Sequence, residues 1–249
     1  MGPALLLALG VAFGWPIAAQ GTLPDLTGPW ALLQVIAETW EVPRLGERLR
    51  RVIQVARVRI AQDGERLTLW AEEVCSMAFD LGTPMVNISV APEFVRTVRV
   101  GPLTGRITRE GDALGIAILP HYVINGAELG RPEDPLPVTA DDPRVGDPDG
   151  DGKPGFTVRV RILGLFPGET YVVQRLRQEY RGRVLSPDLI RGEILWEDEQ
   201  VTLGASAVFF LISGKGRPVP EATFFVLRRL RGEATCAELE AMFIGDLGR

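Results

Sequence analysis

Histidine and cysteine are scarce in this chain of 249 residues, which has one histidine, His121, and two cysteines, Cys75 and Cys236. A single histidine excludes metal centres that need two or more histidine ligands. A Ser-His-Asp triad would have to use His121, and the chain has no Gly-x-Ser-x-Gly turn to present the serine. A catalytic Cys-His pair also fails if the cysteines are bridged. We therefore expect no catalytic residues of these kinds.

Lysine is almost absent as well. Of the 27 basic residues two are lysines, so 25 (27 − 2) are arginines, and they are scattered along the chain. The formal net charge is −5. Proteins that bind nucleic acid usually gather a basic face, so this acidic balance argues against that class of partner. After the N-terminus no apolar stretch reaches the length of a membrane helix, so we expect no membrane span in the mature chain.

The first nineteen residues contain no charge. An apolar run at 4–13 is followed by Ala18-Ala19, small residues typical of a signal-peptide cleavage site, although no basic residue precedes the run. We interpret 1–19 as a secretory signal peptide; an uncleaved anchor or a buried segment is the alternative. The mature protein would then be exported, to the periplasm, the outer surface or the medium.

The two cysteines fit an exported protein, since such proteins keep disulfides. We predict a Cys75–Cys236 disulfide; the alternative is two separate buried thiols. The bridge would close a loop of about 160 residues and stabilise the fold by roughly 4–5 kcal/mol on the chain-entropy treatment.

Hydrophobic residues recur with a period of two, as in Val158, Val160 and Ile162 of the run 157–162. The runs 66–74 and 171–180 alternate in the same way, which predicts strands with one buried face. We therefore predict an all-β fold, an antiparallel barrel or sandwich with a short C-terminal helix. The further strands expected are 30–39, 50–61, 85–90, 94–100, 103–109, 113–119, 189–197, 200–212 and 221–230.

Glycine-bearing turns separate these runs. Asp63-Gly64 and Gly111-Asp112 are strong hairpin signals, and we expect further turns at 180–184 and 213–218. A helix is expected at 235–243, where Thr235 and Glu238 form a capping box.

The segment 131–155 interrupts the strands with six prolines. Prolines remove backbone donors, so the segment reads as a long crossing loop, usually a functional feature or a linker. Two domains are possible, but we favour a single β-rich domain at 20–249 because the disulfide would join both halves.

The crossing loop contains the motif that bears chemistry, "DPDGDGKPGF" from Asp147. Aspartates at its first, third and fifth positions could curl around one hard cation, which takes six to eight oxygen ligands. We predict a calcium site, against the alternative of a solvated acidic turn. The proposed ligands are Asp147, Asp149, Asp151, the Lys153 carbonyl and Asp142, with Asp141, Asp134, Glu133, a carbonyl or water as further candidates.

This motif resembles the DxDGDG loops of dockerins, thrombospondin type 3 repeats and EF-hands over about nine residues. It departs from EF-hands at the twelfth position, Val158, where they have a bidentate glutamate, and it lacks flanking helices. A calcium-sensor role is therefore not implied.

Two wider resemblances are noted. The motif together with "YVVQR" and "GRVLSPDLIRGEI" resembles a group of uncharacterised exported bacterial proteins, which implies an extracytoplasmic β-rich fold without an assigned activity. Gly28-Pro-Trp30 is similar to the Gly-x-Trp that opens the first strand of lipocalins, where the tryptophan plugs the closed end of a barrel.

Three functions follow as hypotheses. The first is a non-enzymatic exported protein with a structural or binding role at the cell envelope. The second is a lipocalin-like barrel for a small apolar ligand, which needs an interior cavity of several hundred Å³. The third is a calcium-supported polysaccharide hydrolase, which needs two carboxylates about 5–10 Å apart in an aromatic cleft. The candidate cavity-lining residues are Trp30, Trp40, Trp70 and Trp196, and the candidate carboxylates are Glu38, Glu41, Glu72 and Glu73.

Overall fold

The structure is a computed structural model that describes residues 23–42, 46–207 and 216–247. The predicted signal peptide lies outside these residues. The strands are β1 (Gly28–Val42), β2 (Gly46–Asp63), β3 (Arg66–Asp80), β4 (Val86–Val90), β5 (Leu103–Glu110), β6 (Ala113–Asn125), β7 (Phe156–Ile162), β8 (Phe166–Ser186), β9 (Leu189–Ala205), β10 (Arg217–Pro218) and β11 (Phe224–Arg229). The helices are α1 (Pro92–Thr97), the 3-10 helix η2 (Pro220–Ala222), α2 (Cys236–Met242) and α3 (Ile244–Leu247). None of the helices in the described residues is long and apolar enough to cross a bilayer.

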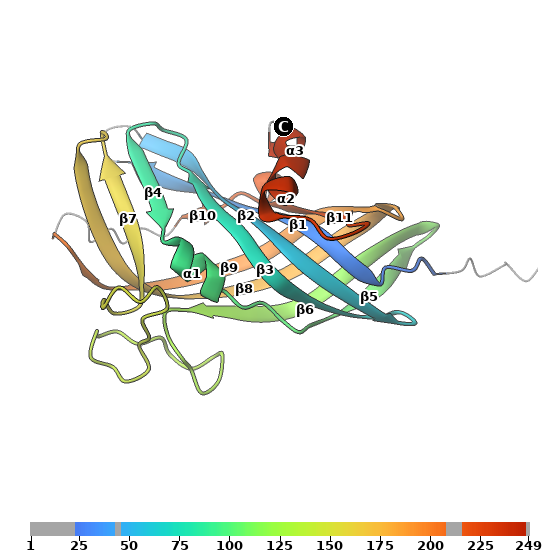
Figure 1. Cartoon of the computed structure of the whole chain (residues 1–249), viewed down its shortest axis with the longest axis horizontal. Helices are drawn as coiled ribbons and strands as arrows, with labels where there is room; N and C mark the ends of the chain where they lie inside the picture. The colour runs from blue at the N-terminus through green and yellow to red at the C-terminus, as the bar shows by residue number, and fades with distance from the viewer. Residues whose placement is uncertain (1–22, 43–45, 208–215, 248–249) are drawn as a thin grey trace, which may run out of the picture.

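The strands form one antiparallel sheet that closes on itself (Figure 1). Its order is β8-β6-β5-β3-β2-β1-β11-β9, and β9 pairs back to β8, so eight strands make a ring. The predicted all-β fold is confirmed, and closure makes it the barrel rather than the sandwich. Strand β8 is long enough to pair with β7 along its first half and with β6 along its second. The β4–β7 pair therefore extends the sheet beside the ring.

The period-two pattern explains which side chains fill the ring. On β1 the even-numbered Trp30, Leu32 and Ile36 join the interior cluster, and the odd-numbered Leu33 and Val35 join a second cluster outside. Both faces of β1 are buried because a helix covers the outer one. The predicted alternation is therefore correct for the inner face, and the apolar outer face marks a docking surface for another element.

The C-terminal helix covers this outer face of β1. Leu239 and Phe243 are completely buried against it. The predicted capping box is present, because Thr235 Oγ1 accepts from the Glu238 amide while the Glu238 carboxylate accepts from the Thr235 amide. The predicted Cys75–Cys236 disulfide ties the start of α2 to β3.

The predictions for 94–100 and for 180–184 are wrong, whereas the hairpin turns at Gly64 and Gly111 are confirmed. Residues 94–100, expected as a strand, begin inside helix α1: Pro92 occupies its first turn, and Phe94 stacks on Phe156 at 4.4 Å between ring centroids. Residues 180–184, expected as a turn, continue β8 because Gly182 pairs with Gly192 of β9. Part of the expected turn at 213–218 lies outside the described residues.

Candidate metal centre in the crossing loop

The crossing loop is tied to the sheet by Arg175 of β8, which donates to the Pro132 carbonyl at 2.8 Å and to the Asp134 carbonyl at 2.7 Å. An isolated bridge joins Ala127 to Val145, and the amide of Gly146 donates to the Gly126 carbonyl at 3.0 Å. The amide of Gly155 donates to the Gly146 carbonyl at 2.7 Å, just before β7 begins. A segment rich in proline is thus held in place by specific hydrogen bonds, which fix where its acidic residues lie. In Figure 1 the loop projects from the body of the sheet near α1 and β7.

Three aspartates of the loop converge as predicted. Asp147, Asp149 and Asp151 each offer a carboxylate oxygen, and these oxygens all lie within 4.8 Å of one another. Asp142 and Asp134 of the same loop have arginine partners, whereas the ion pairs of the described residues include none of the three. Like charges this close repel one another, so the arrangement favours a bound cation.

Asp149 is the buried member of the group, with 8% of its surface exposed. Its Oδ2 accepts from the Thr157 amide at 2.9 Å, but its Oδ1 is buried without any hydrogen-bond partner. Burial raises the pKa of the Asp149 carboxyl, and the charges of Asp151 and Asp147 act in the same direction. A buried carboxylate oxygen without a donor is costly, and a cation would satisfy it.

The local backbone explains how three carboxylates can share one point. Both oxygens of Asp147 accept amides further along the loop, from Asp151 at 3.1 Å and Gly152 at 2.9 Å. This curl needs positive φ at Gly150 (68°) and Gly152 (79°), which glycine adopts without strain. Aspartate and glycine therefore alternate for two separate reasons, charge and backbone conformation.

Of the remaining predicted ligands, Asp142 is not brought to the cluster. It forms an ion pair with Arg144 at 2.7 Å, and hydrogen bonds from Arg144 lower the pKa of the Asp142 carboxyl to about 2. Its charge is thereby balanced within the loop. The Lys153 amide donates to Asp151 Oδ1 at 2.9 Å, which keeps Lys153 next to the cluster, and its Nζ lies 5.7 Å from the Tyr171 ring centre.

Thr157 is a residue of this site that sequence reasoning missed. It is completely buried at the start of β7, and its Oγ1 donates to Asp151 Oδ2 at 2.7 Å while its amide donates to Asp149. It thus couples the acidic loop to the sheet. The signal available in the sequence was a polar residue on a strand directly after the motif.

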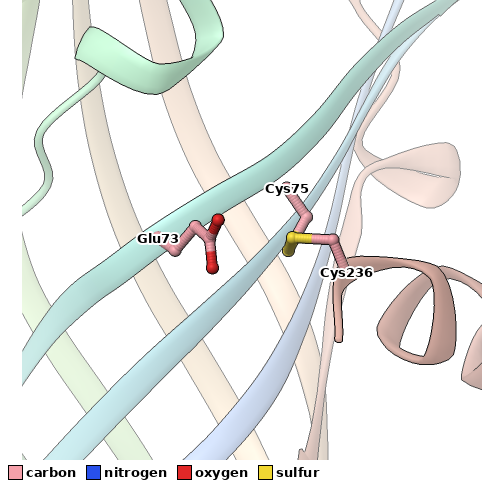
Figure 2. Close-up of side chains that lie close together, drawn as sticks. All are labelled: Glu73, Cys75 and Cys236. Carbon is pink, nitrogen blue, oxygen red and sulfur yellow. A yellow bond between two sulfur atoms is a disulfide. The ribbon is translucent and has the colours of Figure 1, made fainter. Parts of the chain in front are cut away.

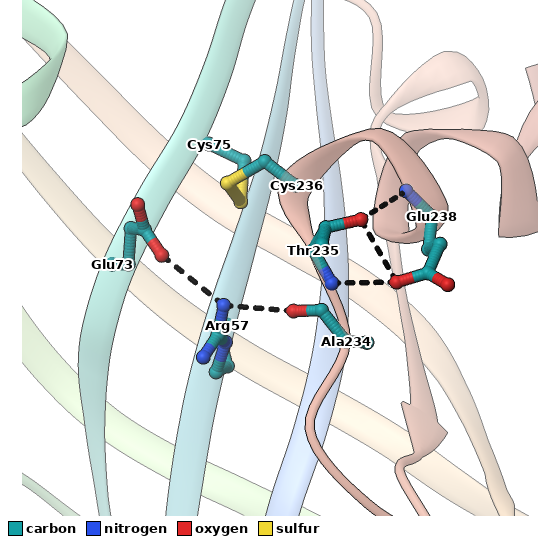
Figure 3. The surroundings of a disulfide bond; sticks show 7 residues. All are labelled: Arg57, Glu73, Cys75, Ala234, Thr235, Cys236 and Glu238. Atoms are coloured by element: carbon teal, nitrogen blue, oxygen red, sulfur yellow. Dashed lines mark hydrogen bonds and ion pairs between the residues drawn. A yellow bond between two sulfur atoms is a disulfide. The ribbon is translucent and has the colours of Figure 1, made fainter.

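A second group of potential ligands, Glu73, Cys75 and Cys236, lies beside α2 (Figure 2). The two sulfurs are bonded to each other, so neither is a thiolate, the form that binds metals. Glu73 pairs with Arg57 at 3.2 Å, and the same guanidinium donates to the Ala234 carbonyl at 2.8 Å (Figure 3). These residues therefore hold the start of α2 against the sheet and do not form a metal site.

The apolar part of the ring interior leaves little space. Its cavity measures about 20 Å³, roughly the room for one water molecule. A larger hollow of about 330 Å³ lies outside the ring, over β4, β7 and β8. Trp30 is fully buried, with its Nε1 donating to the Leu26 carbonyl at 2.9 Å. Trp70 was expected as an interior candidate, but it pairs in register with the exposed Arg59 on the outer face.

Comparisons with protein-family models, curated proteins and solved structures found no match to this chain. The resemblances to calcium loops, to lipocalins and to exported bacterial proteins therefore stay predictions based on short motifs.

Proposed function

We propose that this chain is an exported, non-enzymatic β-rich protein whose crossing loop binds Ca²⁺, with a structural or binding role at the cell envelope. The ion would hold the long link between β6 and β7 in one conformation. Export is supported by the disulfide, since such bonds persist in oxidising compartments.

The surroundings of Asp149 give the main support for a calcium ion in the loop. Asp149 is buried, its Oδ1 has no donor, and two further carboxylates lie within 4.8 Å of it. Oxygen-only ligands suit a hard cation, and a flexible ligand set completed by a carbonyl and water suits Ca²⁺ better than Mg²⁺. The Lys153 carbonyl would fill the seventh position of the motif.

A thermal melt with and without chelator tests the proposal. We expect a lower midpoint in chelator that excess calcium restores, because an ion that binds only the folded state stabilises it by about 2.7 kcal/mol at 100 times its Kd. A variant with Asp149→Ala and Asp151→Ala should respond to neither treatment. Equal midpoints for the parent protein in chelator and in millimolar calcium would contradict the proposal.

The variant Asp149→Asn separates an ion site from a merely structural loop. It removes one of three crowded charges, so it should melt higher than the parent in chelator, by about 2–4 °C for each kcal/mol gained in a protein of this size. It should also lose most of the calcium response. Asp142→Asn is the matched control, since this carboxylate lies in the same loop but pairs with Arg144, and its calcium response should persist.

The two alternative functions are less well supported. A small apolar ligand would need far more room than about 20 Å³ inside the ring. For a polysaccharide hydrolase, Glu72 and Glu73 are poor candidates because they pair with Arg59 and Arg57 on the outer face. Glu38 is buried, and it too is paired with an arginine, Arg50.

A further inference from the structure

The interior of the ring changes from apolar to polar towards the end of β1 and the start of β2, where Val42 pairs with Gly46. Continuing the inward alternation of β1 past Ile36 places Glu38 and Trp40 inside. The register sets Arg50 of β2 opposite Glu38, and sets His121 of β6 and Trp196 of β9 on either side of Gln178 in β8. The apolar interior is therefore followed by a polar layer to which five strands contribute.

Side-chain contacts show that this polar layer faces the interior of the ring. Tyr180 of β8 donates from its hydroxyl to Gln34 Oε1 of β1 at 2.6 Å, although β11 and β9 separate these strands in the ring. His121 stacks on Tyr180 at 5.6 Å between ring centroids. Asn125 Nδ2 donates to Gln174 Oε1 at 3.1 Å along the same inner face.

The charged members of the layer surround Arg50. Its guanidinium pairs with the buried Glu38, lies 5.9 Å from the centre of the Trp40 ring and interacts electrostatically with Asp198 of β9. Asp198 is reached by water yet has protein on most sides, and this burial raises the pKa of its carboxyl. One arginine between two carboxylates leaves no surplus of positive charge.

Several polar atoms of this layer are buried without a partner. They include the N–H donors Trp40 Nε1, Trp196 Nε1, Gln178 Nε2 and Arg50 Nε. His121 Nδ1 lies 3.2 Å from the Leu119 carbonyl and donates to it, and the Gln178 side chain lies beside the same ring, yet His121 Nε2 has no hydrogen-bond partner of normal geometry and can act as an acceptor. Gln178 has only 3% of its surface exposed. Buried polar groups normally have hydrogen-bond partners. Several buried nitrogen atoms without partners in one layer therefore point to a missing ligand.

We propose that the polar layer of the ring, built on Trp40, Trp196, Glu38, Arg50, Gln178 and His121, binds a neutral saccharide. This site is separate from the calcium loop and does not depend on it.

The chemistry selects this ligand class over others. A sugar hydroxyl both accepts and donates, so it can serve the orphaned N–H groups as well as the carboxylates and the imidazole acceptor. The indoles of Trp40 and Trp196 are half-buried and offer apolar faces for the C–H side of a pyranose. An anionic ligand would meet Glu38 and Asp198, and an aliphatic one would leave every orphan unsatisfied.

The test follows the indole N–H signals of the folded protein in ¹H–¹⁵N spectra. The probes are maltohexaose, cellohexaose, xylohexaose and N-acetylchitohexaose, with oligogalacturonate as the anionic arm and palmitate as the apolar arm. We expect at least one neutral oligosaccharide to shift the Trp40 and Trp196 signals with a Kd of about 1 mM or tighter, while the Trp70 signal, from the outer face, stays in place.

Variants of one residue type supply the control. Trp196→Phe keeps an aromatic ring but removes the donor, and it should weaken saccharide binding about tenfold or more; Trp70→Phe should leave binding unchanged. If Trp196→Phe does not fold, the parent's indole shifts still decide the question. The proposal is overturned if no neutral oligosaccharide moves the Trp40 and Trp196 signals, which would mean that water alone fills the layer. Equal shifts at Trp70, or tighter binding of oligogalacturonate or palmitate, would also overturn it.

Discussion

At the scale of single residues, two facing glycines hold β8 and β9 close together. A Cβ added at Gly182 would lie 2.6 Å from Phe225 Cζ and 3.2 Å from Ile190 Cγ2. At Gly192 it would lie 2.0 Å from the Arg181 carbonyl oxygen, which is backbone and cannot swing away. These positions therefore need glycine for space rather than for a turn.

We expect Gly182→Ala to destabilise the protein by about 1–3 kcal/mol, the usual cost of an overfilled core. Gly192→Ala should cost more, because the backbone itself must move. Urea unfolding followed by far-UV circular dichroism measures both. Gly232→Ala is the control, since nothing lies within 4 Å of its added Cβ; a similar loss there would contradict this explanation.

Asp142 should make the stability depend on acid pH. Its hydrogen bonds with Arg144 lower its pKa from the usual 3.8 to about 2. A carboxyl with a depressed pKa in the folded state contributes stability that is complete above the unfolded value and is lost as pH falls. We expect the parent's melting midpoint, measured in chelator, to drop more steeply between pH 4 and pH 2 than that of Asp142→Asn. Parallel curves would show that the pair contributes nothing.

The candidate ion site could be predicted from sequence only in part. The spacing of Asp147, Asp149 and Asp151 was enough to predict that their carboxylates converge, because all three lie in one local turn of the chain. Asp142 was predicted as a ligand but pairs with Arg144, which balances its charge. The sequence alone does not show whether a carboxylate will pair with a nearby arginine or with an ion. The orphaned indoles inside the ring depend on strands far apart in sequence, so no local pattern reveals them.

At the scale of elements, three interactions hold α2 and α3 against the sheet: a disulfide, a hydrogen bond and an ion pair. The disulfide fixes its start to β3, Arg57 holds the preceding Ala234 carbonyl, and Asp246 of α3 pairs with Arg228 of β11 at 2.9 Å. Phe243 completes the packing beneath them. The helix is too short to be stable alone, so these contacts determine whether it forms.

Replacing the disulfide by Cys75→Ser and Cys236→Ser should lower the free energy of unfolding by up to about 5 kcal/mol. It should also speed hydrogen exchange in α2 and α3 before exchange rises in the ring. Thr235→Ala is the comparison variant: it removes only the helix cap and should cost about 1 kcal/mol. Unchanged exchange in α2 after loss of the disulfide would mean that packing and ion pairs suffice.

Elements were predictable where the cause is local. The capping box set the start of α2, and Asp63-Gly64 set the β2–β3 hairpin. Helix α1 was mistaken for a strand because its identity comes from burying Phe94 on Phe156, a distant contact. The runs 189–197 and 200–212 were expected as separate strands, yet β9 is continuous as far as Ala205 because β8 pairs with it along almost its whole length.

At the scale of the whole molecule, the ring's apolar interior is filled by its own side chains. We expect palmitate, added at micromolar concentration, to leave the intrinsic tryptophan fluorescence unchanged, because a cavity of about 20 Å³ has no room for an acyl chain. The outcome that would contradict this expectation is saturable one-to-one binding. It would mean that the interior opens in solution.

Closure of the ring could not be predicted from sequence, although the strands could. Alternation tells which side of a strand is buried, but it does not tell which strand lies beside it. The choice between barrel and sandwich depends on β9 reaching both β8 and β11, a matter of partner and register. Those pairings join residues far apart along the chain.

The position of β1 has a consequence for folding. This strand lies between β2 and β11, so one of its edges stays unpaired until β11, which is far away along the chain, docks beside it. Until then it exposes unpaired amides and carbonyls, a template on which another unfolded copy can add. We expect refolding yields to fall as protein concentration rises, and a chaperone that shields β-edges to restore them.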